Sequence, residues 1–171
     1  MMEKPFVPAD FEVLEQVETT DFILRKLTTK DVEQDYEAVM SSKESLRQIF
    51  AKDDDWPADD MTLEANHEDL EYHETEFNER KSFAYTMRNV DDSRCIGCVY
   101  IYPWFRGGAD AVIYYWVIDS EKAKGLDEKV GSFLRDWIEQ VWPIETPVYP
   151  GRGLTWEEWE AFKEKNRKES E

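Results

Sequence analysis

The sequence predicts a single α+β (α/β) domain with a mixed, mostly antiparallel central sheet flanked by helices. Three observations lead to this fold class. Residues 83–87 and 96–102 carry strand-forming side chains around a polar stretch, which is typical of a hairpin. Residues 111–118 form a continuous apolar run, as expected for a strand covered on both faces. Apolar side chains in 130–141 recur at helical spacing before a short strand candidate at 146–149, which indicates a strand–helix–strand crossover.

The first part of the chain predicts an arm and then the start of the domain. Residues 1–20 show no sustained hydrophobic period, so we expect an N-terminal arm laid over the core and a single domain at 21–171. Residues 22–27 have the composition of a short strand. Thr28 and Asp31 have the spacing of a capping box, which predicts a helix directly after that strand.

Three further helix starts follow from the spacing of hydroxyl and acidic side chains. Ser41 with Glu44 is a second capping box, which is expected to open a short helix. Thr62 is expected to cap a longer helix that ends near Arg80. A capping box at 155–158 is expected to open the last helix.

Composition excludes several classes of partner. The 171 residues include 21 Lys and Arg against 39 Asp and Glu, a formal net charge of -18. Such a chain repels phosphate backbones and anionic membranes, so we expect neither a nucleic acid nor a membrane partner. The longest apolar run is too short to span a bilayer and the first residues lack the order of a signal peptide, so a cytoplasmic location is expected.

The order of these elements resembles the GNAT superfamily of acyl-coenzyme A dependent N-acyltransferases over about residues 21–162. The stretches 35–42 (DYEAVMSS), 97–103 (GCVYIYP) and 148–152 (VYPGR) resemble a divergent branch of that superfamily without an assigned substrate. The resemblance implies acyl transfer from acetyl-CoA, the co-substrate, to a primary amine by direct attack on the thioester. Typical members add a final pair of strands, which we expect this sheet to lack.

Two segments of the chain correspond by position to the coenzyme site of that superfamily. There the fourth strand hydrogen-bonds the pantetheine arm through its backbone, and a loop of form Q/R-x-x-G-x-G/A wraps the pyrophosphate with backbone N–H groups. The resemblance assigns the pantetheine to Trp116, Val117 and Ile118. It assigns the pyrophosphate to Lys122, Ala123, Lys124, Gly125, Leu126 and Asp127.

Asp127 stands where that loop pattern has Gly or Ala. Two like charges ~4 Å apart cost about 4 kcal/mol at an effective dielectric constant of about 20. A helix dipole returns only about 0.3 to 2 kcal/mol to an anion. An ionised Asp127 therefore opposes the pyrophosphate unless Lys122, Lys124 or Lys129 offsets its charge or its side chain turns away. Two alternatives stay open: an altered but working site, or Asp127 as a helix N-cap that occupies the amides.

The candidate catalytic residues are His73 and Tyr149. Many superfamily members carry the acid of the reaction as a tyrosine on the helix after the fifth strand, where this chain has Trp156, Trp159 and Phe162, none of which can donate that proton. Tyr149 is the fallback acid, with a half-buried strand aromatic as the alternative. His73 is the candidate base because histidine takes a proton near neutral pH, and a polar helix face is the alternative.

No metal site is predicted. Cys95 and Cys98 have the spacing of two metal ligands, but residues three apart in a strand point to opposite faces. Residues 53–64 imitate a calcium loop, except that Ala58 replaces the glycine of the turn. The five aspartates around Trp56 can attract a cationic ligand, and the alternative is a solvated loop with Trp56 tucked inward.

Two functions remain open at this point. One is an N-acetyltransferase that uses acetyl-CoA and a small-molecule amine, cationic at neutral pH and held near residues 53–60. The alternative is a GNAT-like domain that has lost coenzyme binding and serves as a binding or interaction module. A weaker possibility is a different donor site in which Arg106 or Arg152 contacts the phosphates. The sequence leaves the oligomeric state open.

Overall fold

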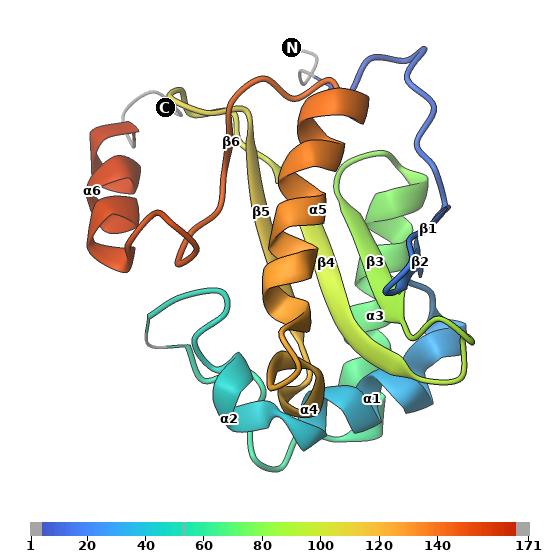
Figure 1. Ribbon diagram of the computed structural model, residues 1–171. Helices are drawn as coiled ribbons and strands as arrows, with labels where there is room; N and C mark the ends of the chain where they lie inside the picture. The colour runs from blue at the N-terminus through green and yellow to red at the C-terminus, as the bar shows by residue number, and fades with distance from the viewer. Residues whose placement is uncertain (1–4, 53, 167–171) are drawn as a thin grey trace.

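A computed structural model of the chain describes residues 5–52 and 54–166 (Figure 1). One sheet of six strands has the order β1-β2-β3-β4-β5-β6. Neighbouring strands are antiparallel except for β5 and β6, which are parallel. The strands are β1 Gln16–Glu18, β2 Ile23–Lys26, β3 Phe83–Arg88, β4 Cys95–Pro103, β5 Ala111–Val117 and β6 Pro147–Val148. The mixed, mostly antiparallel sheet predicted from the sequence is confirmed.

Helices cover both faces of the sheet. Figure 1 shows α5 across one face, with α1 and α3 behind the other. Val130, Leu134 and Ile138 of α5 are fully buried, which seals its face of the core. No helix of the described residues is long and apolar enough to cross a membrane. The helices are α1 Val32–Ser41, α2 Lys43–Leu46, α3 Leu63–Asn78, α4 Asp119–Lys122, α5 Leu126–Val141 and α6 Trp156–Asn166, with a 3₁₀ turn, η1, at Thr29–Asp31.

Two of the predicted capping boxes are present in full. Thr28 and Asp31 satisfy each other's backbone N–H groups at the start of η1, which leads directly into α1. At α6, the Glu158 N–H donates to Thr155 Oγ1 over 3.0 Å, and the Thr155 N–H donates to Glu158 Oε1 over 2.9 Å. Local side-chain chemistry alone therefore fixes where these two helical segments begin.

The capping box predicted at Ser41 is wrong. Ser41 is the last residue of α1, and its Oγ donates to the Ala38 carbonyl over 2.7 Å. Ser42 is the N-cap of α2 but makes no side-chain cap bond; its Oγ instead accepts from the Asp119 N–H over 2.8 Å. The predicted cap residue thus bonds within its own helix, and the serine that does precede α2 makes a tertiary contact instead of a cap.

The N-terminal segment is only partly an irregular arm. Val7 is buried at 3% exposure, and Phe6 stacks on Phe83 with ring centroids 5.8 Å apart, so this stretch does lie over the core. Residues 16–18, however, form β1, an edge strand paired with β2. A three-residue strand is too short to show a period, which explains why the sequence did not reveal it.

The prediction that Cys95 and Cys98 point to opposite faces of their strand is wrong. Arg88 of β3 pairs with Cys95, whereas the preceding Met87 pairs with Gly97, so one residue of β4 is left without a partner. Such a β-bulge shifts the alternation of side chains by one position. Both thiols therefore lie on the face of β4 that meets α1.

The cap of α3 controls a helix that carries candidate site residues. Thr62 Oγ1 accepts from the Ala65 N–H over 3.1 Å, as predicted. We expect Thr62→Ala to lower the free energy of unfolding by about 1 kcal/mol, because an N–H at the helix start loses its partner. Thr62→Ser retains the hydroxyl and serves as the control. Urea unfolding measures both variants, and equal losses would contradict the assignment.

Candidate functional site

The free edge of β5 is the part of the sheet that corresponds to the expected coenzyme site. β5 and β6 pair at only two positions, Ala111 with Pro147 and Val112 with Val148, and then diverge. Beyond that point the backbone groups of alternate residues face away from β4. The Ile118 N–H donates to the Ile96 carbonyl across the β4 edge, over 2.9 Å.

The three residues assigned to the pantetheine therefore differ in what their backbone can offer. Trp116 and Ile118 direct their backbone groups toward β4, whereas Val117 directs its groups toward the gap between β5 and the segment after β6. The Trp116 side chain is buried in the core, where its Nε1 donates to the Tyr100 hydroxyl over 3.0 Å. Only Val117 keeps its backbone on the free edge.

An arginine spans that gap. Arg152 donates through Nη2 to the backbone carbonyl of Tyr115 over 2.8 Å, and through Nη1 to Asp127 Oδ2. Its guanidinium also lies over the Tyr115 ring, 4.0 Å from the centroid. Both charged side chains are largely buried, at 20% and 17% exposure. We refer to these three residues, Tyr115, Asp127 and Arg152, as the Arg152 bridge.

The segment after β6 is shaped to present Arg152 to β5. Arg135 of α5 donates to the Arg152 carbonyl over 2.9 Å and lies 4.3 Å from the centroid of the Tyr149 ring, so α5 holds this segment at two points. Gly151 has a φ of 79°, and a Cβ there would lie 2.6 Å from the Trp156 ring. Glycine is therefore required for the turn that places Arg152.

The segment assigned to the pyrophosphate wraps the start of α5. Lys122 ends α4, Ala123 and Lys124 form a turn, and Lys124 pairs with Glu121 over 3.7 Å. Gly125 is the N-cap of α5 with a φ of 88°, in the left-handed region that favours glycine. The match of this glycine to the family pattern thus has a conformational reason.

Asp127 is not the N-cap of α5. It lies in the first turn, one residue after the buried Leu126, and its carboxylate is paired with Arg152 rather than with helix amides. Lys129, one of the lysines considered as a counter-charge, pairs instead with Asp21 over 3.4 Å. Sequence reasoning named Arg152 as a phosphate contact but missed its pairing with Asp127, because no local pattern links residues so far apart in the chain.

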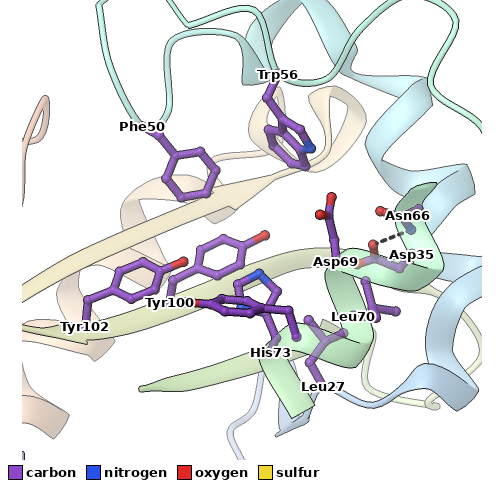
Figure 2. Close-up of a pocket in the computed structure, with 11 residues that line it drawn as sticks. Leu27, Asp35, Phe50, Trp56, Asn66, Asp69, Leu70, His73, Tyr100 and Tyr102 are labelled. Atoms are coloured by element: carbon purple, nitrogen blue, oxygen red, sulfur yellow. Dashed lines mark hydrogen bonds between the residues drawn. The ribbon is translucent and has the colours of Figure 1, made fainter. Parts of the chain in front are cut away.

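A cavity of about 270 Å³ lies on the opposite face of the sheet, between α3, β4 and the loop before α3 (Figure 2). We call it the α3 cavity. Phe50 packs on Tyr100 at 5.1 Å and on Trp56 at 5.5 Å between centroids, which joins the loop to the strand. The aromatic residues that line it are Phe50, Trp56, Tyr72, Tyr100 and Tyr102.

The polar lining of the α3 cavity is acidic. Asp35, Asn66, Asp69 and His73 supply its polar side chains, and no lysine or arginine is among its lining residues. Burial raises the pKa of Asp35 to about 6, although the hydrogen bonds from Asn66 and Cys98 act to lower it. Burial also raises the pKa of Asp69, whose carboxylate points toward Trp56 in Figure 2. Within the described residues neither carboxylate forms an ion pair, so the cavity combines aromatic faces with unpaired carboxylates.

The structure does not bring the two candidate catalytic residues together. His73 lines the α3 cavity, and its ring lies 5.4 Å from that of Tyr100. Tyr149 lies beside Arg135 of α5, on the other face of the sheet, and its buried hydroxyl has no hydrogen-bond partner among the described residues. Burial raises the pKa of Tyr149 to about 12, with Arg135 acting in the opposite direction. Their catalytic roles stay predictions.

The acidic loop before α3 contributes less to the cavity than its charge suggests. Asp53 lies outside the described residues. Asp59 pairs with Arg47 and with Lys43, the latter over 3.4 Å. Trp56 is partly buried and packs inward, so the alternative of a solvated loop with Trp56 tucked inward describes most of this segment.

Arg106, the other arginine considered for phosphate contact, packs against the C-terminal helix. Its guanidinium lies 4.9 Å from the Trp104 ring, and Nη2 donates to the Lys163 carbonyl over 3.4 Å. These contacts hold α6 against the end of β4 and leave Arg106 away from the residues of the expected coenzyme site.

His73 should make stability depend on pH. Burial lowers its pKa to about 4 in the folded chain, against about 6.5 for an unfolded histidine. The unfolded chain binds more protons between these values, so the free energy of unfolding falls as the pH drops through this range. We expect His73→Phe to remove about 2 kcal/mol of the loss between pH 7 and pH 4. Urea unfolding at both pH values tests this, and an unchanged pH dependence in His73→Phe would contradict it.

Comparison with known proteins identifies the fold. No protein-family model matches the chain, and no curated protein does either. Solved structures do match: RimL, an alpha-N-protein acetyltransferase of a ribosomal protein, has a TM-score of 0.58 at 18% identity over 78% of this chain and 70% of its own. The self-immunity acetyltransferase MccE, in complex with acetyl-CoA and AMP, has a TM-score of 0.55 at 16% identity over 72% and 67%.

A third match names the superfamily in its description. An acetyltransferase of the GNAT family from Bordetella pertussis has a TM-score of 0.54 at 12% identity over 74% of this chain and 73% of its own. At such low sequence identity, the similarity to these structures concerns the fold alone. The chain therefore has the fold of the GNAT acetyltransferases.

Proposed function

We propose that this chain is a GNAT-like domain that has lost coenzyme binding and serves as a binding module for a small amine. The observation that carries the proposal is the Arg152 bridge. Its guanidinium lies between β5 and the start of α5, where the resemblance to the superfamily would put the pantetheine and the pyrophosphate of acetyl-CoA.

The bridge opposes the coenzyme in two ways. The Tyr115 carbonyl already accepts from Arg152, so a pantetheine amide must compete for the free edge of β5. The Asp127 carboxylate also sits in the first turn of α5, the position from which helix amides would contact a pyrophosphate. Separating the two partly buried charges leaves each without its partner, and that cost subtracts directly from the affinity for the coenzyme.

The α3 cavity supplies the binding site of this proposal. Aromatic faces attract cations through their ring quadrupoles, and the Asp69 carboxylate adds a full negative charge without a competing lysine or arginine in the lining. The volume of about 270 Å³ suits a compact molecule. With a net charge of -18, the whole chain also favours the approach of a cation.

Acetyl transfer is the second candidate function. Its support is the fold shared with MccE, which is described in complex with acetyl-CoA, together with the glycine kept at the start of α5. In this version acetyl-CoA displaces Arg152 from Asp127, and Arg152 turns to the phosphates. Tyr149 then supplies the proton for the thiolate and His73 accepts one from the amine, although the two residues lie on different faces of the sheet.

Acetyl-CoA binding distinguishes the two functions. We expect no rise in the melting temperature of the natural chain with acetyl-CoA at up to 1 mM, roughly the upper end of ordinary substrate constants. Asp127→Gly removes the opposing charge and frees Arg152, so this variant should show a rise of a few degrees. Arg152→Ala, which leaves Asp127 unpaired, is the matched control and should show none.

A clear rise in the natural chain would contradict the loss of coenzyme binding and would favour acetyl transfer. A rise in Arg152→Ala equal to that in Asp127→Gly would show that the guanidinium blocks the site by its volume rather than that Asp127 blocks it by charge.

Amine binding is tested separately from the coenzyme. We expect cyclohexylamine to bind the natural chain more tightly than cyclohexanol, its neutral counterpart, by isothermal titration. Asp69→Asn should weaken the amine about fivefold, because the cation loses a charge partner that lines the cavity. Glu68→Gln makes the same change of charge on the neighbouring residue, which does not line the cavity, and should have little effect. Equal binding of amine and alcohol would contradict the amine site.

A further inference from the structure

A buried cluster of two thiols and one carboxylate lies beneath the α3 cavity. Cys95 Sγ, Cys98 Sγ and a carboxylate oxygen of Asp35 all lie within 4.8 Å of one another. Cys95 and Asp35 are each 3% exposed, and Cys98 is fully buried. Asp35 comes from α1 and the thiols from β4, so the cluster joins two elements distant in sequence.

The cluster exists because of the bulge in β4. In a regular strand Cys95 would point toward α5, on the far side of the sheet from Cys98. The unpaired residue between Cys95 and Gly97 turns the first thiol to the side of α1. A bulge costs backbone pairing, and bulges commonly redirect a side chain at a site.

The carboxylate of this cluster has no basic partner. In the described part of the chain neither lysine nor arginine forms an ion pair with Asp35, although it is almost fully buried. Its contacts are hydrogen bonds: Asn66 Nδ2 donates to Oδ2 over 2.9 Å, and Cys98 Sγ donates to Oδ1 over 3.4 Å. Buried carboxylates are normally paired with a cation or bound to a metal.

We propose that Cys95, Cys98 and Asp35 bind a thiophilic divalent cation of the Zn²⁺ type. Two thiolates and a carboxylate are ligands that Zn²⁺ takes, at about 2.3 Å for sulfur and about 2.0 to 2.2 Å for oxygen. Ligand atoms around a tetrahedral ion are then about 3.5 to 3.8 Å apart, which is compatible with the spacing of the cluster. The ion replaces the two thiol protons, which leave to solvent.

Two of the three proposed ligands, Asp35 and Cys95, already have an outer partner that can stay in place. Asn66 bonds the Asp35 oxygen that faces away from Cys98, which leaves Oδ1 for the ion. Thr86 Oγ1 donates to Cys95 Sγ over 3.5 Å. Hydrogen bonds of this kind orient metal ligands and raise affinity.

The fourth position of the ion faces the α3 cavity. Asp35 lines that cavity, so the ion enters from there and a water molecule completes its tetrahedron. The site therefore has three protein ligands and one exchangeable ligand. This proposal shares Asp35 with the lining of the amine site, but it rests on the two thiols, which do not line the cavity.

Zinc retention tests the proposal. The reduced, metal-free chain is loaded with Zn²⁺, passed over a chelating resin, and analysed for metal by mass spectrometry. We expect about one Zn²⁺ per chain, and at least tenfold weaker binding in Cys98→Ser and in Asp35→Asn. Ile96→Val, a buried change on the same strand that removes no ligand, is the control and should retain the metal.

Two outcomes would overturn the site. The strongly acidic surface can hold Zn²⁺ adventitiously, and equal retention in the natural chain and both ligand variants would indicate that. Should the variants fail to fold, as judged by circular dichroism, Co²⁺ replaces Zn²⁺ in the natural chain. A thiolate-to-cobalt absorption band is then expected, and its absence contradicts binding by the cysteines.

Discussion

The pairing of β4 with β5 is the interaction on which the rest of the structure depends. Seven consecutive residue pairs join the two strands, and both are buried on nearly their whole length. Because side chains alternate across a strand, this single register decides which side chains of β4 and β5 lie on each face of the sheet. Cys98, Tyr100 and Trp116 point to the side of α1 and α3. Tyr115 points to α5, where its hydroxyl lies so close to Gly131 that a Cβ there would be 2.6 Å away.

Much of the fold could be predicted from local patterns. The hairpin, the buried strand and three of the four helix starts follow from the spacing of apolar residues and caps, since these features act within a few residues. The wrong cap at Ser41 shows the limit. Helix α1 runs through that residue, and the N-cap of α2 is Ser42, whose hydroxyl accepts from Asp119 instead of capping its own helix. The bulge at Cys95 shows another, since strand alternation assumes a regular ladder that one extra residue breaks.

The candidate site was less accessible to sequence reasoning than the fold. The mismatch of Asp127 with the family loop pattern was visible in the sequence, and the structure gives its partner as Arg152. That partner could not be chosen from sequence, because any of several basic residues could reach the start of α5. Asp35 was missed because, on a helix rich in acids, only its burial distinguishes it from solvated neighbours. Asp69 is exposed, and only its position at the α3 cavity sets it apart.

The Arg152 bridge also constrains the order in which such a domain can acquire substitutions during evolution. Losing Arg152 first leaves the partly buried Asp127 carboxylate without its partner near β5. This loss lowers stability and creates no group that could bind an anion. Losing Asp127 first leaves the Arg152 guanidinium at the N-terminus of α5, still hydrogen-bonded to the Tyr115 carbonyl. The two single-step routes between a closed and an open edge are therefore unequal, and only the one that begins at Asp127 passes through an intermediate that attracts anions.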